Sequence, residues 1–395
     1  MATPILVLNC GSSSVKYQVI DIDSEAVLAS GLVEKIGLPE GSIIHRTGDQ
    51  EYRVDEPIPD HTAALNLVIR AFAEYGPPLD DVVAVAHRTV HGGWLFNQTV
   101  VITPEVIRGM EDVSELAPLH NPAGLAGIRA AQQALPNVPH VAIFDTAFFA
   151  SMPPEAYTYA IDRQVAEKYH LRKYGFHGTS HRYVSGKVAQ FLGRDITSFN
   201  QIVCHLGNGA SISAIQGGQP IDTSMGMTPL AGLVMGTRSG DVDPAVFAHL
   251  YNVAGMDTCA TDNLLNKRSG LAGLADGTSD FRDLHAKIDA GDPQAQLAFD
   301  VYIHRLVFYL GAYMALLGHT DTITFTAGVG ENDPTVRAAA IGRLTGCGVK
   351  IDPISNLIRS RDARVISAAD STALVLVVPT NEELAMAREA YRVIG

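Results

Sequence analysis

The chain has 395 residues with a net charge of −13, and it contains 47% hydrophobic and 18% charged residues. Chains of this length exceed the size at which a single core stops growing, so we expect two domains. The acidic charge argues against a protein that depends on a basic nucleic-acid footprint, although a few arginines still suffice for a local anion site.

Runs with strand and helix character alternate along the whole chain, which predicts an α/β protein. The strands are expected at residues 5–9, 16–22, 82–86, 140–144, 201–206, 211–216, 322–327 and 373–378. The helices are expected at residues 62–75, 123–135, 178–192, 243–253, 292–318 and 381–393. Residues 150–175 lack either pattern and are interpreted as an irregular connection, with the domain boundary near its start.

The four cysteines have neither C-x-x-C nor zinc-site spacing, which indicates reduced thiols. No apolar run reaches the length of a membrane span, and the first residues lead into a strand without a signal peptide. We therefore predict a cytoplasmic protein with no membrane or nucleic-acid partner.

Residues 9–16, NCGSSSVK, place a small, hydroxyl-rich turn between two strands. Glycine and serine allow backbone N–H groups to approach an anion, and Lys16 supplies a point charge. Asn9, at the end of the first strand, could hold a hydrated magnesium ion or orient a carboxylate. The alternative is an ordinary hairpin with a serine-rich turn.

Residues 202–216, IVCHLGNGASISAIQ, repeat this strand–turn–strand pattern in the second half of the chain. Neither turn completes a Walker or G-x-G-x-x-G motif, so P-loop and Rossmann interpretations lack support. Two similar hairpins that face one another across a cleft could bind the phosphates of one nucleotide.

Residues 325–333, FTAGVGEND, form a third glycine-rich segment. A strand is expected to end at Ala327, a glycine turn to follow, and a helix to start near Pro334. Together with the two hairpins, this turn is interpreted as the place where an adenine ring or a ribose meets bare backbone.

Two arginines lie in glycine-rich loops. Arg88 stands between two histidines just after a predicted strand, and Arg238 lies beside Asp241 and Asp243. Arginine forks match carboxylate and phosphoryl oxygens, although loop arginines also form structural salt bridges.

Residues 174–181, YGFHGTSH, carry His177 and His181 four positions apart. A zincin needs a glutamate directly after the first histidine, and Gly178 stands there instead. We expect His177 to donate to developing phosphoryl charge and His181 to be a packing residue. Asp145 ends a predicted strand and is either at the active edge of the sheet or a helix cap.

Nine motifs in this order resemble the acetokinase family, within the superfamily of acetate and sugar kinases, actin and heat-shock chaperones. They are NCGSSSVK, HRTVHGG, APLHNP, FDTAF, YGFHGTSH, HLGNGAS, DTSMGMTPLAGLVMGTRSGDVDP, TAGVGEN and PTNEEL. The resemblance spans essentially the whole chain and implies two ribonuclease H-like α/β domains with the active-site cleft between them. The domains would be 1–148, completed by the C-terminal helix 383–395, and 149–382.

The resemblance also implies the reversible transfer of the γ-phosphoryl group of ATP to acetate, with magnesium, in a homodimer. Asn9 and Glu382 would be associated with the metal, and Asp145, His177, Arg88 and Arg238 would act on the reacting groups. The implied nucleotide residues are Ser12, Ser14, Lys16, His205, Leu206, Gly207, Asn208, Gly209, Asp280, Phe281, Arg282, Gly328, Val329, Gly330, Glu331 and Asn332. The implied acyl pocket consists of Arg88, Val90, Leu119, Phe176 and Pro229.

An acetate oxygen is already a nucleophile at neutral pH, so a base is redundant and Asp145 is expected to orient an arginine or the metal. The sequence departs from the family pattern at Trp94, Phe149 and Ala231, which leaves acyl-chain preference and the dimer surface open. The competing interpretations are a propionate or butyrate kinase, a chaperone- or actin-like ATPase that drives a partner, and a zinc hydrolase. The sequence does not give the physiological direction or the range of nucleotides.

Overall fold

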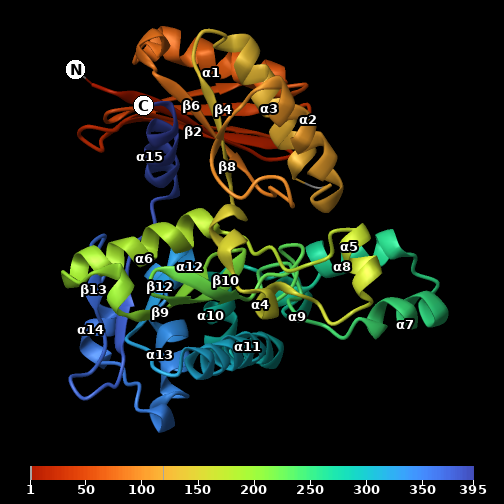
Figure 1. The fold of residues 1–395 in the computed structure, drawn as a ribbon, viewed down its shortest axis with the longest axis vertical. Coiled ribbons are helices and arrows are strands. Elements are labelled where there is room, and N and C mark those ends of the chain that lie inside the picture. The colour runs from red at the N-terminus through yellow and green to blue at the C-terminus, as the bar shows by residue number, and fades with distance from the viewer. Residues whose placement is uncertain (1, 119) are drawn as a thin grey trace. The chain divides into compact units, whose positions relative to one another are not determined.

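The computed structural model describes residues 2–118 and 120–395. Contacts between residues divide the chain into two compact units, and each unit contains one sheet with helices on its faces (Figure 1). Unit 1 comprises Met1–Ala150 and Asn381–Gly395, and unit 2 comprises Ser151–Thr380. The chain is therefore an α/β protein with two sheets.

The sheet of unit 1 has eight strands in the order β5-β4-β3-β2-β1-β6-β8-β7. Their bounds are β1 Pro4–Cys10, β2 Ser14–Asp21, β3 Val27–Glu34, β4 Ser42–Thr47, β5 Gln50–Asp55, β6 Ala84–Thr89, β7 Val100–Val101 and β8 His140–Phe144. Strands β1 to β5 form an antiparallel meander, whereas β1, β6 and β8 are parallel. The carboxyl ends of these three parallel strands therefore lie at one edge.

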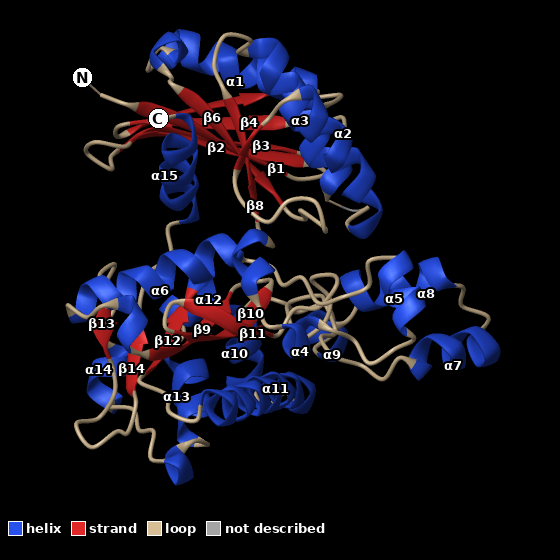
Figure 2. Cartoon of the chain, in the orientation of Figure 1, coloured by secondary structure: helices blue, strands red, loops and turns tan. Residues whose placement is uncertain are grey.

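Helices cover both faces of this sheet, which explains why β1 and β8 are apolar without alternation. The helices of unit 1 are α1 His61–Tyr75, α2 Pro104–Asp112, α3 Asn121–Ala134 and α15 Glu382–Ile394. Helices α1 and α3 pack together on one face, and the C-terminal helix α15 packs against β1, β6 and β8 on the other (Figure 2).

The sheet of unit 2 has six strands in the order β11-β10-β9-β12-β14-β13. Their bounds are β9 Asn200–Leu206, β10 Ala210–Gln216, β11 Gln219–Thr223, β12 Thr322–Thr326, β13 Arg364–Val365 and β14 Leu374–Val377. Here β9, β10 and β11 are antiparallel, and β9, β12 and β14 are parallel. The arrangement repeats that of β1, β2, β3, β6 and β8 in unit 1.

The helices of unit 2 are α4 Pro154–Tyr157, α5 Arg163–Lys168, α6 Gly178–Leu192, α7 Ala245–Ala254, α8 Thr258–Lys267, α9 Gly270–Leu274, α10 Phe281–Asp289, α11 Pro293–Leu317, α12 Ala327–Asn332, α13 Pro334–Gly342 and α14 Pro353–Leu357. Helix α6 packs against β9, and α11 packs against β9 and β10 from the opposite side of the sheet (Figure 2). In the part of the chain that the structure describes, no helix combines the length and the apolar character needed to cross a bilayer.

The predicted strands and helices are confirmed, and strand 140–144 and helix 178–192 match to the residue. The expectation of an irregular connection over 150–175 was wrong, because α4 and α5 form there. Asp162 caps α5 by accepting the Val165 N–H at 2.9 Å. The apolar residues of this segment do not follow helical spacing, so the sequence pattern did not predict the helix.

Gly31 on β3 lies against a buried aromatic ring. A Cβ atom at this position would lie 2.2 Å from Cζ of Tyr17 and 2.6 Å from the carbonyl oxygen of Ile44. The Tyr17 ring is held in place because its hydroxyl is hydrogen-bonded to Nδ1 of His45 at 2.8 Å.

We predict that Gly31→Ala lowers the midpoint of urea unfolding, because overpacking a close-packed interior costs about 1–3 kcal/mol. Gly124→Ala in α3 is the matched control. A Cβ there would meet no heavy atom within 4 Å, and alanine is the better helix former by about 1 kcal/mol. Equal midpoints for the two variants would contradict this description of the sheet.

Candidate active site

In unit 1, the serine-rich turn joins β1 to β2 as predicted. The Gly11 N–H donates to the Ser14 carbonyl at 2.8 Å, and the ring of His61 on α1 is hydrogen-bonded to the Gly11 carbonyl at 2.8 Å. Ser12 lies in the turn and is exposed, whereas Ser14 is the first residue of β2 and is half-buried. The hairpin is therefore anchored through its backbone, and the Ser12 hydroxyl is accessible to solvent.

Lys16 lies on β2 rather than in the turn, where it is paired in register with Asn9 on β1. Its ammonium forms an ion pair with Glu383 in the first turn of α15. About half of the Lys16 side chain is exposed, so this pair is at the surface and contributes little to stability. The lysine can exchange Glu383 for an anionic ligand at small cost.

Arg88 and Asp145 form a two-bond ion pair at the carboxyl ends of β6 and β8. The Arg88 Nε and Nη2 atoms donate to the two carboxylate oxygens at 3.1 and 2.7 Å. The Asp145 side chain is 2% exposed and that of Arg88 is 22% exposed. The charge of the carboxylate raises the pKa of the Arg88 guanidinium. The two bonds hold the Arg88 guanidinium in one orientation, and part of it remains accessible.

Glu382 opens α15, and the side chain of Asn381 caps this helix through the Leu384 N–H at 2.9 Å. Burial raises the pKa of the Glu382 carboxyl, an effect that the charge of Arg88 partly offsets. Within residues 2–118 and 120–395, neither the Glu382 nor the Asn9 side chain has a hydrogen-bond partner. A carboxylate and an amide oxygen that lack partners fit a hard, hydrated cation such as magnesium.

Among the described residues, no group of three or more His, Cys, Asp or Glu side chains is placed to hold a metal ion. A metal at Asn9 and Glu382 would therefore keep several water ligands, as magnesium does.

In unit 2, His177 precedes α6 in the left-handed backbone conformation, with φ of 59°. A residue other than glycine holds this conformation only where its surroundings impose it. Here Nδ1 of His177 is hydrogen-bonded to Oγ of Ser211 at 2.9 Å, and the ring stacks on His205 with centroids 4.3 Å apart. The ring is thus fixed on two sides.

Gly209, in the turn between β9 and β10, brings His177 and Arg238 together. A Cβ at Gly209 would lie 3.5 Å from Nη1 of Arg238 and 3.5 Å from Cε1 of His177. Nη1 of Arg238 also donates to the carbonyl of Pro229 at 3.2 Å. The structure therefore gathers four predicted residues of unit 2 around one point.

The segment predicted as a glycine turn at 328–332 is instead the short helix α12, and β12 ends at Thr326 rather than at Ala327. The Glu331 carboxylate accepts the N–H of Ala327 at 2.9 Å and that of Thr380 at 3.1 Å. A carboxylate at the first helical N–H group stabilises the helix, which explains why two glycines do not prevent it.

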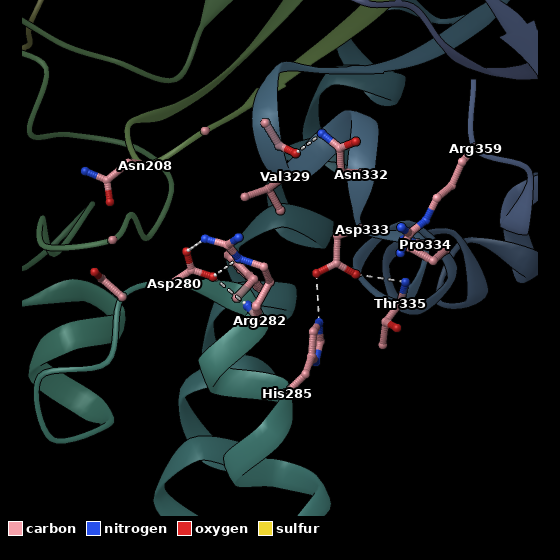
Figure 3. A pocket seen from close by; sticks show the side chains of 15 residues that line it. Asn208, Asp280, Arg282, His285, Val329, Asn332, Asp333, Pro334, Thr335 and Arg359 are labelled. Carbon is pink, nitrogen blue, oxygen red and sulfur yellow. Dashed lines mark hydrogen bonds and ion pairs between the residues drawn. The ribbon is translucent and has the colours of Figure 1, made fainter. Parts of the chain in front are cut away.

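A pocket of about 610 Å³ lies in unit 2 (Figure 3). Three predicted nucleotide segments supply its walls: Gly207 and Asn208, Asp280 to Arg282, and Gly328, Val329 and Asn332. The remaining lining residues are Gly236, Ser279, His285, Asp333, Pro334, Thr335 and Arg359. This volume is in the range of pockets for small ligands and cofactors.

Two polar pairs shape this pocket (Figure 3). Asp280 caps α10 and binds Arg282 through two bonds of 3.0 and 2.7 Å, which lowers the pKa of its carboxyl to about 2. His285 is hydrogen-bonded to Asp333 at 2.7 Å, and Asp333 also caps α13. Sequence reasoning missed His285 and Arg359, since neither carries a local motif.

Other predicted residues lie away from the pocket wall. Leu206 and Gly330 are buried in unit 2, and His205 is buried against His177. Of the predicted acyl pocket, Phe176 is buried and Pro229 half-buried in unit 2, Val90 is half-buried in unit 1, and Leu119 lies outside the described residues.

The three departures from the family pattern have ordinary surroundings. Phe149 is buried, with the ring of Phe148 edge-on at 5.2 Å, whereas Trp94 is 42% exposed. Ala231 is half-buried, and its Cβ lies within 3.2 Å of a Cβ built on Gly226. None of the three contacts the pocket of unit 2.

Two α/β units with the same strand order, accessible arginines and a pocket of small-ligand size are the features expected of a phosphotransferase of the kinase class. The family model described as the acetokinase family matches residues 4–388. The chain belongs to this family, whose members use ATP.

Individual relatives support the assignment. Acetate kinase of Leifsonia xyli subsp. xyli (strain CTCB07) is 56% identical over 398 residues, which cover 99% of each chain. The crystal structure of Porphyromonas gingivalis acetate kinase is 42% identical, with a TM-score of 0.94 over 100% of both chains. The structure of a propionate kinase from Francisella tularensis subsp. tularensis SCHU S4 is 39% identical, with a TM-score of 0.94 over 99% of this chain and 100% of that one.

Proposed function

We propose that the protein transfers the γ-phosphoryl group of ATP to acetate, giving acetyl phosphate and ADP, and that the reaction is reversible. The observation that carries the proposal is the pocket of unit 2, in which three segments distant in sequence meet, within a chain whose relatives are acyl kinases. We also propose that units 1 and 2 are the two predicted domains.

The nucleotide base and ribose would occupy the pocket, against the Asp280–Arg282 segment and the bare backbone of Gly328. The phosphates would be bound by backbone N–H groups of the turns at Ser12–Ser14 and Gly207–Gly209, since glycine and serine leave such groups accessible. Lys16 would contribute its charge once it leaves Glu383.

The reacting groups would be stabilised by charge and position alone. Arg88, held by Asp145, and Arg238, held by the Pro229 carbonyl, suit the acetate carboxylate and the transferring phosphoryl group. His177 would donate an N–H to the phosphoryl oxygens. Acetate is ionised at neutral pH, so Asp145 is not needed as a base.

Asn9 and Glu382 would hold magnesium, which supplies charge neutralisation of the phosphates when it is bound. The support for this assignment is that, within residues 2–118 and 120–395, neither side chain has a hydrogen-bond partner, and that the charges of Asp145 and Glu383 both act on the Glu382 carboxyl.

A propionate or butyrate kinase is the second candidate, and the likeness to the propionate kinase of Francisella tularensis favours it. One methylene in an apolar pocket discriminates by only about 1–3 kcal/mol, so small changes near Val90, Phe176 or Pro229 decide the preferred acid.

The experiment measures acyl phosphate, trapped as hydroxamate, from ATP and magnesium with acetate, propionate or butyrate. We expect acetate to be preferred and Arg238→Ala or Arg88→Ala to lower kcat about 100-fold or more, because each removes a charge that stabilises the transition state. Asn9→Ala should raise the magnesium concentration needed for half-maximal rate.

Arg163→Ala is the matched control, since this arginine on α5 is 76% exposed and pairs with Glu167 in its own helix. Preference for a longer acid would support the second candidate. If ATP is hydrolysed or bound but none of the acids is phosphorylated, the proposal fails and a partner-driving ATPase becomes the better interpretation.

We further propose that the protein is a homodimer that pairs through α11. Leu297, Val301 and Phe308 fall on one stripe of this helix and are exposed, Phe308 to 59%. Helix α7, with the apolar sequence AVFAHLYNVA, also has no buried residue. Such surfaces mark protein contacts.

Light scattering coupled to gel filtration tests the dimer. We expect a dimer for the wild type and a monomer for Phe308→Lys, while Phe191→Lys, at an exposed phenylalanine on α6, should remain dimeric. A monomeric wild type, or a dimeric Phe308→Lys, would contradict the α11 interface.

A further inference from the structure

A buried chain of hydrogen bonds leads to His177 in unit 2. Oγ of Ser213 is bonded to Nδ1 of His181 at 2.7 Å, and Nε2 of His181 to Oγ of Ser211 at 2.7 Å. Oγ of Ser211 is then bonded to Nδ1 of His177 at 2.9 Å. Ser211, Ser213 and His181 are fully buried, and the two serines lie on the same face of β10 because they are two residues apart.

The number of protons available fixes which group donates and which accepts in each of these hydrogen bonds. Burial lowers the pKa of His181 well below its ordinary value, so its ring is neutral and has one N–H. Each of its nitrogens faces a serine hydroxyl. One serine must therefore donate to His181 and the other must accept from it.

Ser213 decides which serine donates. Within the described part of the chain, Oγ of Ser213 has no hydrogen-bond partner other than His181. If it accepted from His181, its own buried proton would have no acceptor, which costs more than an unused lone pair. Ser213 therefore donates to Nδ1 of His181, and Nε2 of His181 carries the proton and donates to Ser211.

Ser211 has one proton, and with Nε2–H of His181 pointing at it, the acceptor left for that proton is Nδ1 of His177. We propose that Ser211, oriented by His181 and Ser213, is a positioning residue that holds His177 as the neutral tautomer with its proton on Nε2. The inference rests on the proposed function, because it specifies which nitrogen donates during phosphoryl transfer.

Nε2 is the nitrogen that the reaction would use. A Cβ at Gly209 would lie 3.6 Å from Nε2 of His177 and 3.5 Å from Nη1 of Arg238, so this side of the ring faces the turn assigned to the phosphates. Nδ1 points the other way, toward β10. The hydrogen bonds from Ser213 to His177 thus make Nε2–H of His177 the donor while its ring stays neutral.

The same series of hydrogen bonds opposes protonation of His177. Forming the imidazolium would turn Nδ1 into a donor and force Ser211, His181 and Ser213 to reverse. Among the described residues, the titratable and charged groups near His177 include His181 on α6, His205 on β9 and Arg238. Glu331 is joined to them through Thr380, Ser180 and His205. The nearby arginine also disfavours a second positive charge.

The first test is made on the wild-type protein. Long-range ¹⁵N–¹H NMR of ¹⁵N-histidine-labelled protein reports which nitrogen carries the proton, and the His177 signals are assigned by their absence from the spectrum of His177→Gln. We expect the Nε2–H pattern at pH 7 and above. An Nδ1–H pattern, or an imidazolium at pH 7, would overturn the inference.

The second test uses Ser211→Ala, which removes the hydroxyl that donates to Nδ1. We expect the pKa of His177 to rise and the acid limb of the kcat profile to move up by about 0.5–1 pH unit, the effect of one hydrogen bond of ordinary strength. The rate at neutral pH should fall up to about tenfold. Ser211→Thr, which keeps a hydroxyl, should restore the wild-type profile.

Ser185→Ala is the matched control. This buried serine on α6 donates to the Arg182 carbonyl and does not belong to the hydrogen-bonded series from Ser213 to His177. A purely structural role for Ser211 predicts loss of kcat with no change in the pH profile or in the tautomer, and that result would refute the inference. Failure of the wild type to form any acyl phosphate would refute the proposed function instead, while the NMR result would stand.

Discussion

The ion pair between Asp145 and Arg88 is the interaction on which the chemistry of unit 1 depends. A carboxylate that is 2% exposed must be paired, and two short bonds to one guanidinium satisfy it. Three carboxylates, Asp145, Glu382 and Glu383, then share two cations, Arg88 and Lys16. Because Arg88 is paired with Asp145 and Lys16 with Glu383, the Glu382 carboxylate has no ion-pair partner among the residues that the structure describes. This imbalance is the physical basis for placing magnesium beside Asn9 and Glu382.

In unit 2, neutral groups contact the side chains that would donate to the phosphoryl group. His177 is held by Ser211 and by stacking on His205, and Nη1 of Arg238 donates to the backbone carbonyl of Pro229. The guanidinium of Arg238 and the ring of His177 are both hydrogen-bond donors, which suits groups that would attract phosphoryl oxygens. Rigid donors that are aimed before the ligand arrives are the arrangement that stabilises developing charge most effectively. Both units thus fix their charged or donating side chains through contacts made from the strand ends.

Much of the fold was predictable because strands such as 140–144 and helices such as 178–192 carry strong apolar patterns. The errors fall where a single capping or acidic side chain, rather than an apolar pattern, decides the local structure. Helix α12 forms in a glycine-rich segment because Glu331 accepts its first N–H, and α5 depends on a single capping aspartate. In the candidate site, short motifs predicted Arg88, Asp145 and His177, and Ser211 ends the HLGNGAS motif, but the bonds of Ser211 to His177 and of His285 to Asp333 join residues far apart in sequence. No local pattern could reveal them.

A double-mutant cycle tests most directly the claim that Asp145 works through Arg88 rather than as a base. It compares kcat/KM for acetate in the wild type, Asp145→Asn, Arg88→Ala and the double variant. If Asp145 only orients the guanidinium, its substitution has little further effect once Arg88 is absent, and the two losses are strongly non-additive. If the losses add fully, Asp145 contributes independently of Arg88, and the account of catalysis by positioned charge is contradicted.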